Sequence, residues 1–422
     1  MKKIKMLIAL AAMSLILVMS LTGCGIFLTA EMNIGDGMLS GYDGYYDALV
    51  FRYYGDDSMK IVNLTTGNPD FAAPITAAIP DYEEETAFGR QGNDIMSKVK
   101  RVTIEANVTG IGAYYFYQCT DLEEVYIGPD VDYIGENAFK DCNNIKTIVV
   151  DEANQYFEVK DGSLIEKSSG RLIRCTGSGD VVFGAEITSI EDCAFAGLTE
   201  LTSVDLSATT IPEVSEKAFA FCESLTEVKL PATVATIDKS AFLKCGNLAG
   251  LDFKSLSSLK EINDYAFFRC NAITTLEMPE NLTHIRVMAF ANCEGLTTIV
   301  TNERNVSIGN NAFYDCPAIT TVTFNNADTF GKVRNSSAQG YVAAASYRGT
   351  FGDVNRNITV YVKADVVASD SFANDLNFGT YFKEKKDVDA EGNVINTTPS
   401  VYVKGADTTI NGITYATFTP AK

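Results

Sequence analysis

Residues 225–248 of the chain read LTEVKLPATVATIDKSAFLKCGNL. Apolar side chains at Leu225, Val228 and Leu230 are separated by polar ones, and this alternation predicts a short strand with one face inward. A proline follows, and a second apolar pair then leads to the letters AFLKC. The phenylalanine of this last segment recurs at equivalent places along the chain, at Phe116, Phe139, Phe195, Phe219, Phe242, Phe267, Phe290 and Phe313.

These phenylalanines are 23 to 25 residues apart at every step except one, which spans 56 residues. A repeat of this period falls within the range of leucine-rich repeats. The whole unit resembles the BspA-like leucine-rich repeat family of bacterial surface proteins, over about residues 99–324. The long step fits as well, because residues 156–175, YFEVKDGSLIEKSSGRLIRC, are similar to a hairpin insert that interrupts repeats in that family.

The resemblance implies a solenoid with a parallel β-sheet on one face and broadly adhesive or recognition roles, without a common ligand. We therefore predict an α/β repeat solenoid, rich in β-structure and of the leucine-rich-repeat type. Its parallel sheet is expected on the concave face, with short helical turns at the AFxxC segments. A cap is expected at both ends, because an open solenoid end would expose its core.

The N-terminal segment has the features of an export signal. A basic start is followed by an apolar run of 16 residues, from Met6 to Leu21, which is short for a membrane span and typical of a signal peptide. The run ends in Leu21-Thr22-Gly23-Cys24, which resembles the bacterial lipobox. That resemblance implies that the thiol of Cys24 is diacylated and that Cys24 becomes the mature N-terminus.

The chain is accordingly divided into four predicted segments. They are a lipoprotein signal peptide at 1–23, a lipid tether with an N-terminal cap at 24–98, the solenoid at 99–324, and a C-terminal cap with a small β-rich appendage at 325–422. The hairpin insert is expected at about 154–180. Within the last segment, Asn411-Gly412 lies between TTI and ITY and predicts a two-residue β-hairpin.

Seven cysteines follow a repeat phenylalanine by three positions. A structural zinc site needs about four ligands that converge on one point, whereas equivalent solenoid positions form a column. Parallel Cβ directions in such a column also suit disulfides poorly. The repeat of Phe195 has Leu198 at this position, so a small buried apolar residue is predicted there. The predicted core column is Cys119, Cys142, Cys222, Cys245, Cys270, Cys293 and Cys316.

Cys175 and Cys193 lie outside this column. Cys193 occupies a position that is polar in other repeats, so its side chain is expected to be more exposed than those of the column cysteines. A disulfide between Cys175 and Cys193 and two free thiols both stay open, because the sequence does not fix their distance.

Composition and motifs argue against several functions. A formal net charge of −20 disfavours binding to nucleic acid. The chain has no H-E-x-x-H, G-x-S-x-G or P-loop motif, and its one histidine, His284, takes a variable and mostly polar repeat position that is expected at the surface. We therefore predict no catalytic residues, no metal ligands and no cofactor.

The better functional candidates are the polar residues between the apolar ones of each L-x-x-L-x-L strand, which are expected to point to solvent. Threonine is also simply a good residue for a solvated strand, so a purely structural surface remains an alternative. The candidate ligand-binding residues are Glu124, Tyr126, Asp205, Glu227, Lys229, Asp252, Thr275, Glu277 and Thr298.

Together these features predict a non-catalytic recognition or adhesion protein at the cell surface, outside the cytoplasm and held to a membrane by lipid. Its partner is expected to be an extracellular protein or another surface macromolecule, bound through the solenoid by a monomer. The residues themselves indicate an exposed, rigid and acidic protein, and the role in adhesion comes from the resemblance. The alternatives are a structural spacer of the cell envelope and an enzyme with a site in residues 325–422.

Overall fold

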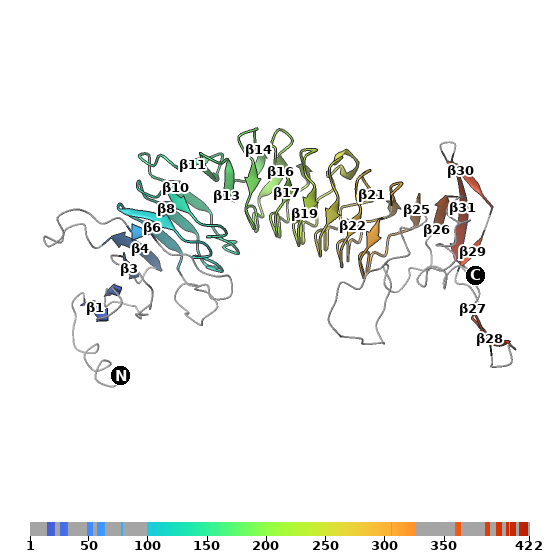
Figure 1. Cartoon of the computed structure of the whole chain (residues 1–422), viewed down its shortest axis with the longest axis horizontal. Coiled ribbons are helices and arrows are strands. Elements are labelled where there is room, and N and C mark those ends of the chain that lie inside the picture. Colours follow the sequence, from blue (N-terminus) through green and yellow to red (C-terminus); the bar gives the residue numbers. More distant parts are fainter. Residues whose placement is uncertain are drawn as a thin grey trace. The chain divides into compact units, whose positions relative to one another are not determined.

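The computed structural model describes residues 99–304 and 306–325 without further gaps (Figure 1). Outside this range it describes residues 15–21, 26–32, 49–53, 57–63, 77–78, 359–363, 385–388, 394–398, 402–404, 406–410 and 413–420. The chain divides into two compact units. One comprises residues 1–177 with 191–195, and the other comprises residues 178–190 with 196–422.

The described part of the first unit is built from β-strands. A seven-stranded sheet has the order β1-β2-β3-β4-β6-β8-β10, and a short sheet has the order β5-β7-β9. The repeat strands β6, β8 and β10 are parallel and in register. The bounds are β1 (Leu15–Leu21), β2 (Ile26–Met32), β3 (Leu49–Tyr53), β4 (Ser58–Asn63), β5 (Ala77–Ala78), β6 (Arg101–Ile104), β7 (Val108–Ile111), β8 (Glu124–Ile127), β9 (Tyr133–Ile134), β10 (Thr147–Val150), β11 (Phe157–Lys160), β12 (Ser163–Glu166) and β13 (Arg171–Cys175).

The segment that interrupts the repeats forms three antiparallel strands, β11, β12 and β13. Asp161 and Gly162 join the first two strands and both have positive φ angles, of 50° and 72°, as a two-residue hairpin turn of this kind requires. Phe157, Leu164 and Ile173 from these strands are buried in the same hydrophobic cluster as the repeat residues of this unit. The insert therefore adds to the core and does not hang from the coils as a loose loop.

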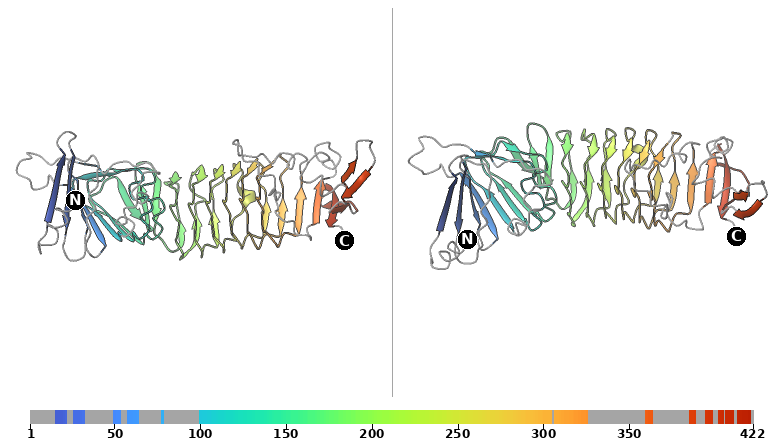
Figure 2. Two further views of the ribbon diagram at one scale, coloured as in Figure 1. Left: turned by 90° about the horizontal axis from the view of Figure 1, so that it is seen from below. Right: turned by 60° about the horizontal axis from the view of Figure 1, so that its bottom comes forward.

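The second unit stacks repeat strands in two parallel rows (Figure 2). The strands of the L-x-x-L-x-L segments form β14-β16-β18 and β21-β23-β25-β26, and the short strands before each AF segment form β17-β19-β20-β22-β24. The bounds are β14 (Gly179–Val182), β15 (Ser189–Ile190), β16 (Leu201–Asp205), β17 (Glu213–Val214), β18 (Glu227–Lys229), β19 (Thr236–Ile237), η2 (Phe253–Ser255), β20 (Glu261–Ile262), β21 (Thr275–Glu277), β22 (His284–Ile285), β23 (Thr298–Val300), β24 (Ser307–Ile308), β25 (Thr321–Phe324), β26 (Thr359–Lys363), β27 (Lys385–Val388), β28 (Val394–Thr398), β29 (Tyr402–Lys404), β30 (Thr408–Ile410) and β31 (Ile413–Pro420).

Beyond the repeats, β26 pairs parallel with β25 and antiparallel with β31. β30 and β31 form an antiparallel pair in which Ile410 lies opposite Ile413, so the predicted hairpin around Asn411-Gly412 is confirmed. The remaining predictions for the caps and for the lipidation of Cys24 fall largely or wholly outside the described residues.

The predicted helical turns at the AFxxC segments are wrong, and with them the α/β class. These segments are turns, and the described residues form a β-solenoid of stacked parallel strands with one three-residue 3₁₀ helix, η2. No described helix is long and apolar enough to cross a membrane. The reason lies in the backbone, because the residues two before and two after each repeat phenylalanine have φ between 52° and 77°. A left-handed residue at each of these places interrupts any α-helix.

The left-handed residues direct alternate N–H groups to different partners. Around Phe219, the N–H groups of Lys217, Phe219 and Phe221 donate to carbonyls of the next coil, at 2.7 to 3.0 Å. The N–H groups of the residues between them, and that of Cys222, donate back within the turn, at 2.9 to 3.2 Å. A helix would use every N–H inside its own segment, whereas this turn uses half of them to bind the next coil.

The repeat phenylalanines stack into ladders in the core. Within the second unit, the ring of Phe242 lies parallel to those of Phe219 and Phe267, each with a centroid separation of 5.0 Å. The series continues to Phe290 and Phe313 at 4.9 and 5.6 Å. Offset stacking of this kind stabilises by about 1 kcal/mol per pair beyond the burial of apolar area.

The predicted cysteine column is confirmed as buried core, and its thiols have one further role. Cys270 Sγ donates to the backbone carbonyl of Phe242 in the preceding coil at 3.0 Å, and Cys245 makes the same contact with Phe219 at 2.9 Å. Cys142, Cys293 and Cys316 each make the same contact with the phenylalanine carbonyl of the preceding coil, at 2.8 to 3.1 Å. Cysteine is therefore suited to this position because it is small and apolar and still carries a weak donor.

The two remaining cysteines differ from expectation. Cys193 is buried, with 1% of its surface exposed, so its predicted exposure is wrong. It occupies the left-handed position two residues before Phe195, and its backbone carbonyl accepts a hydrogen bond from the Arg174 guanidinium. Cys175 is also fully buried, and the structure places neither cysteine in a disulfide. Leu198, in contrast, is only half-buried, so its position is less enclosed than those of the column cysteines.

We predict that no described thiol reacts with an aromatic disulfide reagent in the native protein. The nine described cysteines are buried reduced thiols, and burial raises the pKa of the Cys270 and Cys245 thiols, whereas the thiolate is the reactive form. In a Cys24→Ser chain, denaturant should release nine equivalents without any reductant. A count two lower would show that two of these cysteines form a disulfide and would contradict the structure.

A partly buried ion pair joins the insert to the coils of the first unit. Arg171 Nη1 lies 2.5 Å from Glu191 Oε1, and Arg171 Nη2 donates to the backbone carbonyl of Ile134 at 2.5 Å. The other oxygen of Glu191 accepts the N–H of Asn137 at 3.3 Å. Burial raises the pKa of Glu191 to about 7, and the charge of Arg171 opposes that rise.

We expect the stability of the first unit to fall with rising pH. The folded protein keeps the Glu191 proton to a higher pH than the unfolded chain, so this contribution is complete below pH 4.5 and is lost as the pH rises through 7. The change in the free energy of unfolding is on the order of 3 kcal/mol. Thermal melts between pH 4.5 and 8 should show this slope, and Glu191→Gln should flatten it.

The control for this measurement is Glu166→Gln, which removes the other carboxylate partner of Arg171, at 3.2 Å. It should retain the wild-type slope. Equal slopes for the wild type and Glu191→Gln would show that this carboxyl group does not titrate in the window.

Candidate functional site

The outward residues of the repeat strands form a mostly polar surface in the second unit, in two stretches, over β14-β16-β18 and over β21-β23-β25. We call this surface the strand face, meaning the outward side chains of β14, β16, β18, β21, β23 and β25. Inward residues such as Val228 and Leu276 are buried, whereas Glu227, Thr275 and Glu277 next to them are exposed. Because the strands are parallel and in register, equivalent outward residues line up from strand to strand.

Two of the predicted site residues belong to the first unit. Glu124 is exposed on β8, and the Tyr126 hydroxyl donates to Asp151 Oδ2 at 2.5 Å. This hydrogen bond raises the pKa of Tyr126 and lowers that of Asp151. Val149, the register partner of Tyr126 on β10, is 47% exposed and was not among the predicted residues.

Three of the predicted site residues lie close together in the second unit. Lys229 Nζ lies 3.5 Å from Asp205 Oδ2 and 3.9 Å from Glu227 Oε2. Both the hydroxyl and the backbone N–H of Ser207 donate to Asp205 Oδ1, and these hydrogen bonds lower the pKa of Asp205. The lysine is therefore shared between two carboxylates at a solvent-exposed site.

Asp252 and Glu277 are linked through a residue that the sequence did not single out. Asp252 Oδ1 accepts the backbone N–H of Lys254 at 3.1 Å and so caps the short helix η2. Lys254 Nζ lies 2.8 Å from Glu277 Oε2, and this pairing raises the pKa of Lys254. The sequence feature that could have indicated η2 is the spacing of Phe242 and Phe267. They are 25 residues apart, two more than the usual 23, and the extra residues make room for η2.

The threonines divide into two groups. Thr226 and Thr297, at the first outward position of their strands, donate their hydroxyls to backbone carbonyls of the preceding coil at 3.0 and 2.9 Å. These hydroxyl groups therefore add hydrogen bonds to backbone carbonyls at the start of each strand. The predicted residues Thr275 and Thr298 occupy the second outward position and are register partners on neighbouring strands. The threonine richness of this surface is thus partly structural, as the alternative interpretation expected.

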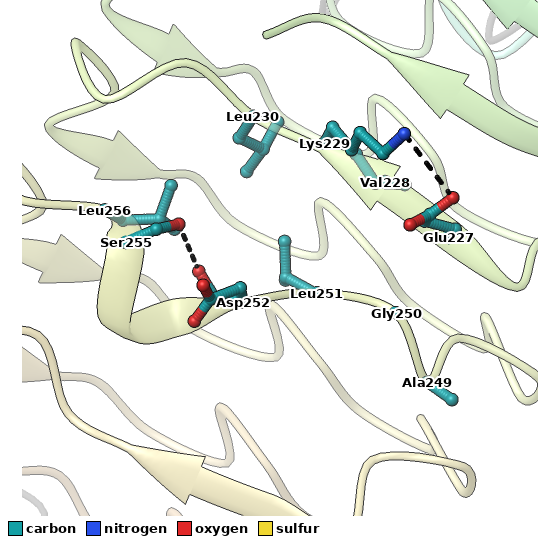
Figure 3. A pocket seen from close by; sticks show the side chains of 10 residues that line it. All are labelled: Glu227, Val228, Lys229, Leu230, Ala249, Gly250, Leu251, Asp252, Ser255 and Leu256. Atoms are coloured by element: carbon teal, nitrogen blue, oxygen red, sulfur yellow. Dashed lines mark hydrogen bonds and ion pairs between the residues drawn. The ribbon is translucent and has the colours of Figure 1, made fainter.

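A hollow of about 480 Å³ opens between β18 and η2 (Figure 3). Leu230 and Leu251 point toward each other across it, and Leu256 lies beside them. Glu227, Lys229 and Asp252 stand at its rim. We call it the Gly250 hollow, after the glycine that lines it. Three of the predicted site residues therefore lie around one open cavity.

The arrangement around the one histidine does not form a nucleophilic pair. His284 is partly exposed, with Nδ1 2.9 Å from Thr283 Oγ1 and 3.5 Å from Glu261 Oε1. Cys293 is fully buried and its thiol contacts the backbone of Phe267. Within the residues that the structure describes, no group of three or more histidine, cysteine or acidic residues is arranged to hold a metal ion.

Comparison with known proteins gives the class of the chain. The sequence pattern of the BspA type leucine rich repeat region matches residues 94–160, 173–270 and 212–337, in 6 copies. These residues make up more than half of the chain, so the chain belongs to the family of BspA type leucine-rich repeat proteins. No curated protein matches the chain.

Several solved structures are similar to it at low identity. A leucine-rich repeat protein of T. pallidum is 24% identical, covering 40% of this chain and 79% of its own, with a TM-score of 0.34. A leucine rich cell surface protein of Faecalibacterium prausnitzii is 18% identical, covering 68% and 95%, with a TM-score of 0.35. The pneumococcal vaccine antigen PcpA is 15% identical, covering 86% and 96%, with a TM-score of 0.41.

Proposed function

We propose that this protein is a non-catalytic recognition or adhesion protein of the cell surface, and that it binds a protein or another surface macromolecule through the strand face. The observation that carries this proposal is the strand face itself. It is a row of exposed polar and charged side chains held in register by parallel backbone pairing. A binding surface built on such pairing loses little conformational freedom when a partner docks.

The charge of the chain favours a particular class of partner. The net charge is −20, and the strand face carries Asp205, Glu227 and Glu277 against Lys229, with Asp252 and Lys254 next to it at η2. Basic or polar macromolecules are attracted to such a surface and acidic polymers are repelled, and this affects both specificity and the rate of encounter.

The proposal includes an anchor at the N-terminus. The basic start, the 16-residue apolar run and Leu21-Thr22-Gly23-Cys24 support attachment to a membrane through diacylated Cys24. Two acyl chains suffice for stable anchoring, whereas a single chain binds only marginally.

The proposed anchor predicts that Cys24→Ala releases the protein from its membrane. In the native host, or a bacterial host with lipoprotein processing, the wild-type chain should incorporate a labelled fatty acid and sediment with membranes. Cys24→Ala should incorporate none, and Cys119→Ala, which removes a buried cysteine, should behave as the wild type. Equal labelling of Cys24→Ala would overturn the anchor.

Binding through the strand face predicts that two substitutions there abolish adhesion. Beads coated with the full chain, tested on cultured epithelial cells and on bacterial cells, should bind at least about tenfold less with Glu277→Arg/Thr298→Arg, because bulky cations then face a basic partner. The matched control is Glu294→Arg/Thr199→Arg, which makes the same change of charge at exposed positions on the turns.

The control beads should bind as the wild type does. Equal adhesion by both double variants would exclude the strand face as the site. If the wild-type beads bind no better than uncoated beads, the chain acts as a spacer of the envelope and not as an adhesin.

A further inference from the structure

The Gly250 hollow exists because one coil of the second unit lacks outward side chains. Neighbouring coils carry Thr226 and Glu227 or Thr274 and Thr275 at the two outward positions, whereas this coil carries Ala249 and Gly250. The φ of Gly250 is not positive, so the backbone does not require glycine there. A Cβ at Gly250 would lie 3.0 Å from Cβ and Cγ of Glu227, so a larger residue would crowd the hollow.

The same coil also breaks the ladder of strands. Gly250 makes a single parallel bridge to Glu227, and β18 and β21 are the end strands of separate sheets. The two extra residues of this repeat make room for η2, which follows Asp252. Leu251 and Leu256 are thereby brought to the floor of the hollow beside Leu230.

The charges at the rim are unevenly paired. Lys254 is engaged with Glu277, and Lys229 is divided between Asp205 and Glu227. Asp252, within the part of the chain that the structure describes, is in no ion pair, and one of its oxygens accepts only a backbone N–H. The rim thus offers carboxylates to a cation from outside, above a floor of leucine side chains.

We propose that the Gly250 hollow binds an arginine side chain of the polypeptide that docks on the strand face. The methylene groups of the arginine pack on the exposed parts of Leu230 and Leu251, as long cationic side chains do on apolar surfaces. The guanidinium reaches Asp252 and Glu227, and its planar fork suits two carboxylates better than the compact ammonium group of lysine does. This inference rests on the proposed function, since it names the chemistry that the strand face recognises.

The test uses peptides and the full chain carrying ¹³C-labelled leucine methyl groups. The probe is acetyl-Gly-Gly-Arg-Gly-Gly-amide, and its control replaces arginine with citrulline, which has almost the same shape without the charge. The arginine peptide should shift the methyl resonances of Leu230, Leu251 and Leu256 with a Kd near the millimolar range, as expected for one side chain. The citrulline peptide should bind at least about fivefold more weakly.

Two pairs of variants locate the effect. Gly250→Ala adds a methyl group against Glu227, whereas Gly246→Ala adds one in the same coil with no atom within 4 Å. Asp252→Asn removes the charge and keeps an N-cap residue, whereas Glu294→Gln removes an exposed charge on a turn. The first member of each pair should weaken binding of the arginine peptide at least about threefold, and the second should leave it unchanged.

Equal binding of the arginine and citrulline peptides, or equal affinities within both pairs, would overturn the inference. Its failure can be told from that of the proposed function. If the arginine peptide moves none of these methyl groups while Glu277→Arg/Thr298→Arg still abolishes adhesion, the hollow is refuted and the strand face stands. If the peptide binds as expected while adhesion is unaffected, the hollow is a real site and the proposed adhesion is refuted.

Discussion

The structure depends on the way the AFxxC turns of adjacent coils divide their backbone hydrogen bonds. Alternate N–H groups bind the next coil and the turn itself, as around Phe219, and left-handed residues on both sides of the phenylalanine impose this division. A non-glycine residue in this conformation costs about 1 kcal/mol, and the inter-coil bonds that it permits offset this. The phenylalanine ladder and the Cys270-type thiol contacts follow, because the turns hold their side chains in register.

Much of this arrangement could be predicted from the sequence, because burial has a clear period. Leu225, Val228 and Leu230 alternate with polar residues, and the repeated cysteine takes one position in each coil, so the strands and the buried column could both be deduced. The conformation of the turns could not. Asn137 and Asp315 belong to residue types that favour left-handed backbone, but Lys217 and Met288 do not. The equivalent positions therefore share no residue type that indicates the conformation, and a helical turn was predicted instead. The prediction that Cys193 is exposed was wrong for the same reason, because Cys193 occupies one of these left-handed turn positions.

The candidate site was predicted in part for similar reasons. Outward residues such as Glu227 and Glu277 followed from strand periodicity alone. The hollow beside Gly250 and the role of Lys254 did not, because they arise where the repeat departs from its own rule. This coil has two extra residues, and it has the small residues Ala249 and Gly250 where its neighbours have larger ones. The hollow that results also depends on side chains of the neighbouring coils, which the sequence does not place in space. Irregularities in an otherwise strict repeat are therefore where recognition chemistry is best sought.

The hydrogen bonding of the turns also makes the coils interchangeable. Each coil donates backbone N–H groups to carbonyls of the next coil, and its cysteine thiol donates to a carbonyl of the preceding coil. These contacts use the backbone and one buried side chain, so they depend little on the surface residues of a coil. Insertion or loss of a 23-residue unit would preserve these contacts and move the hollow along the stack by about 4.8 Å, the spacing of neighbouring strands. In this architecture the distance between two recognition features can change in fixed steps during evolution, without redesign of the core.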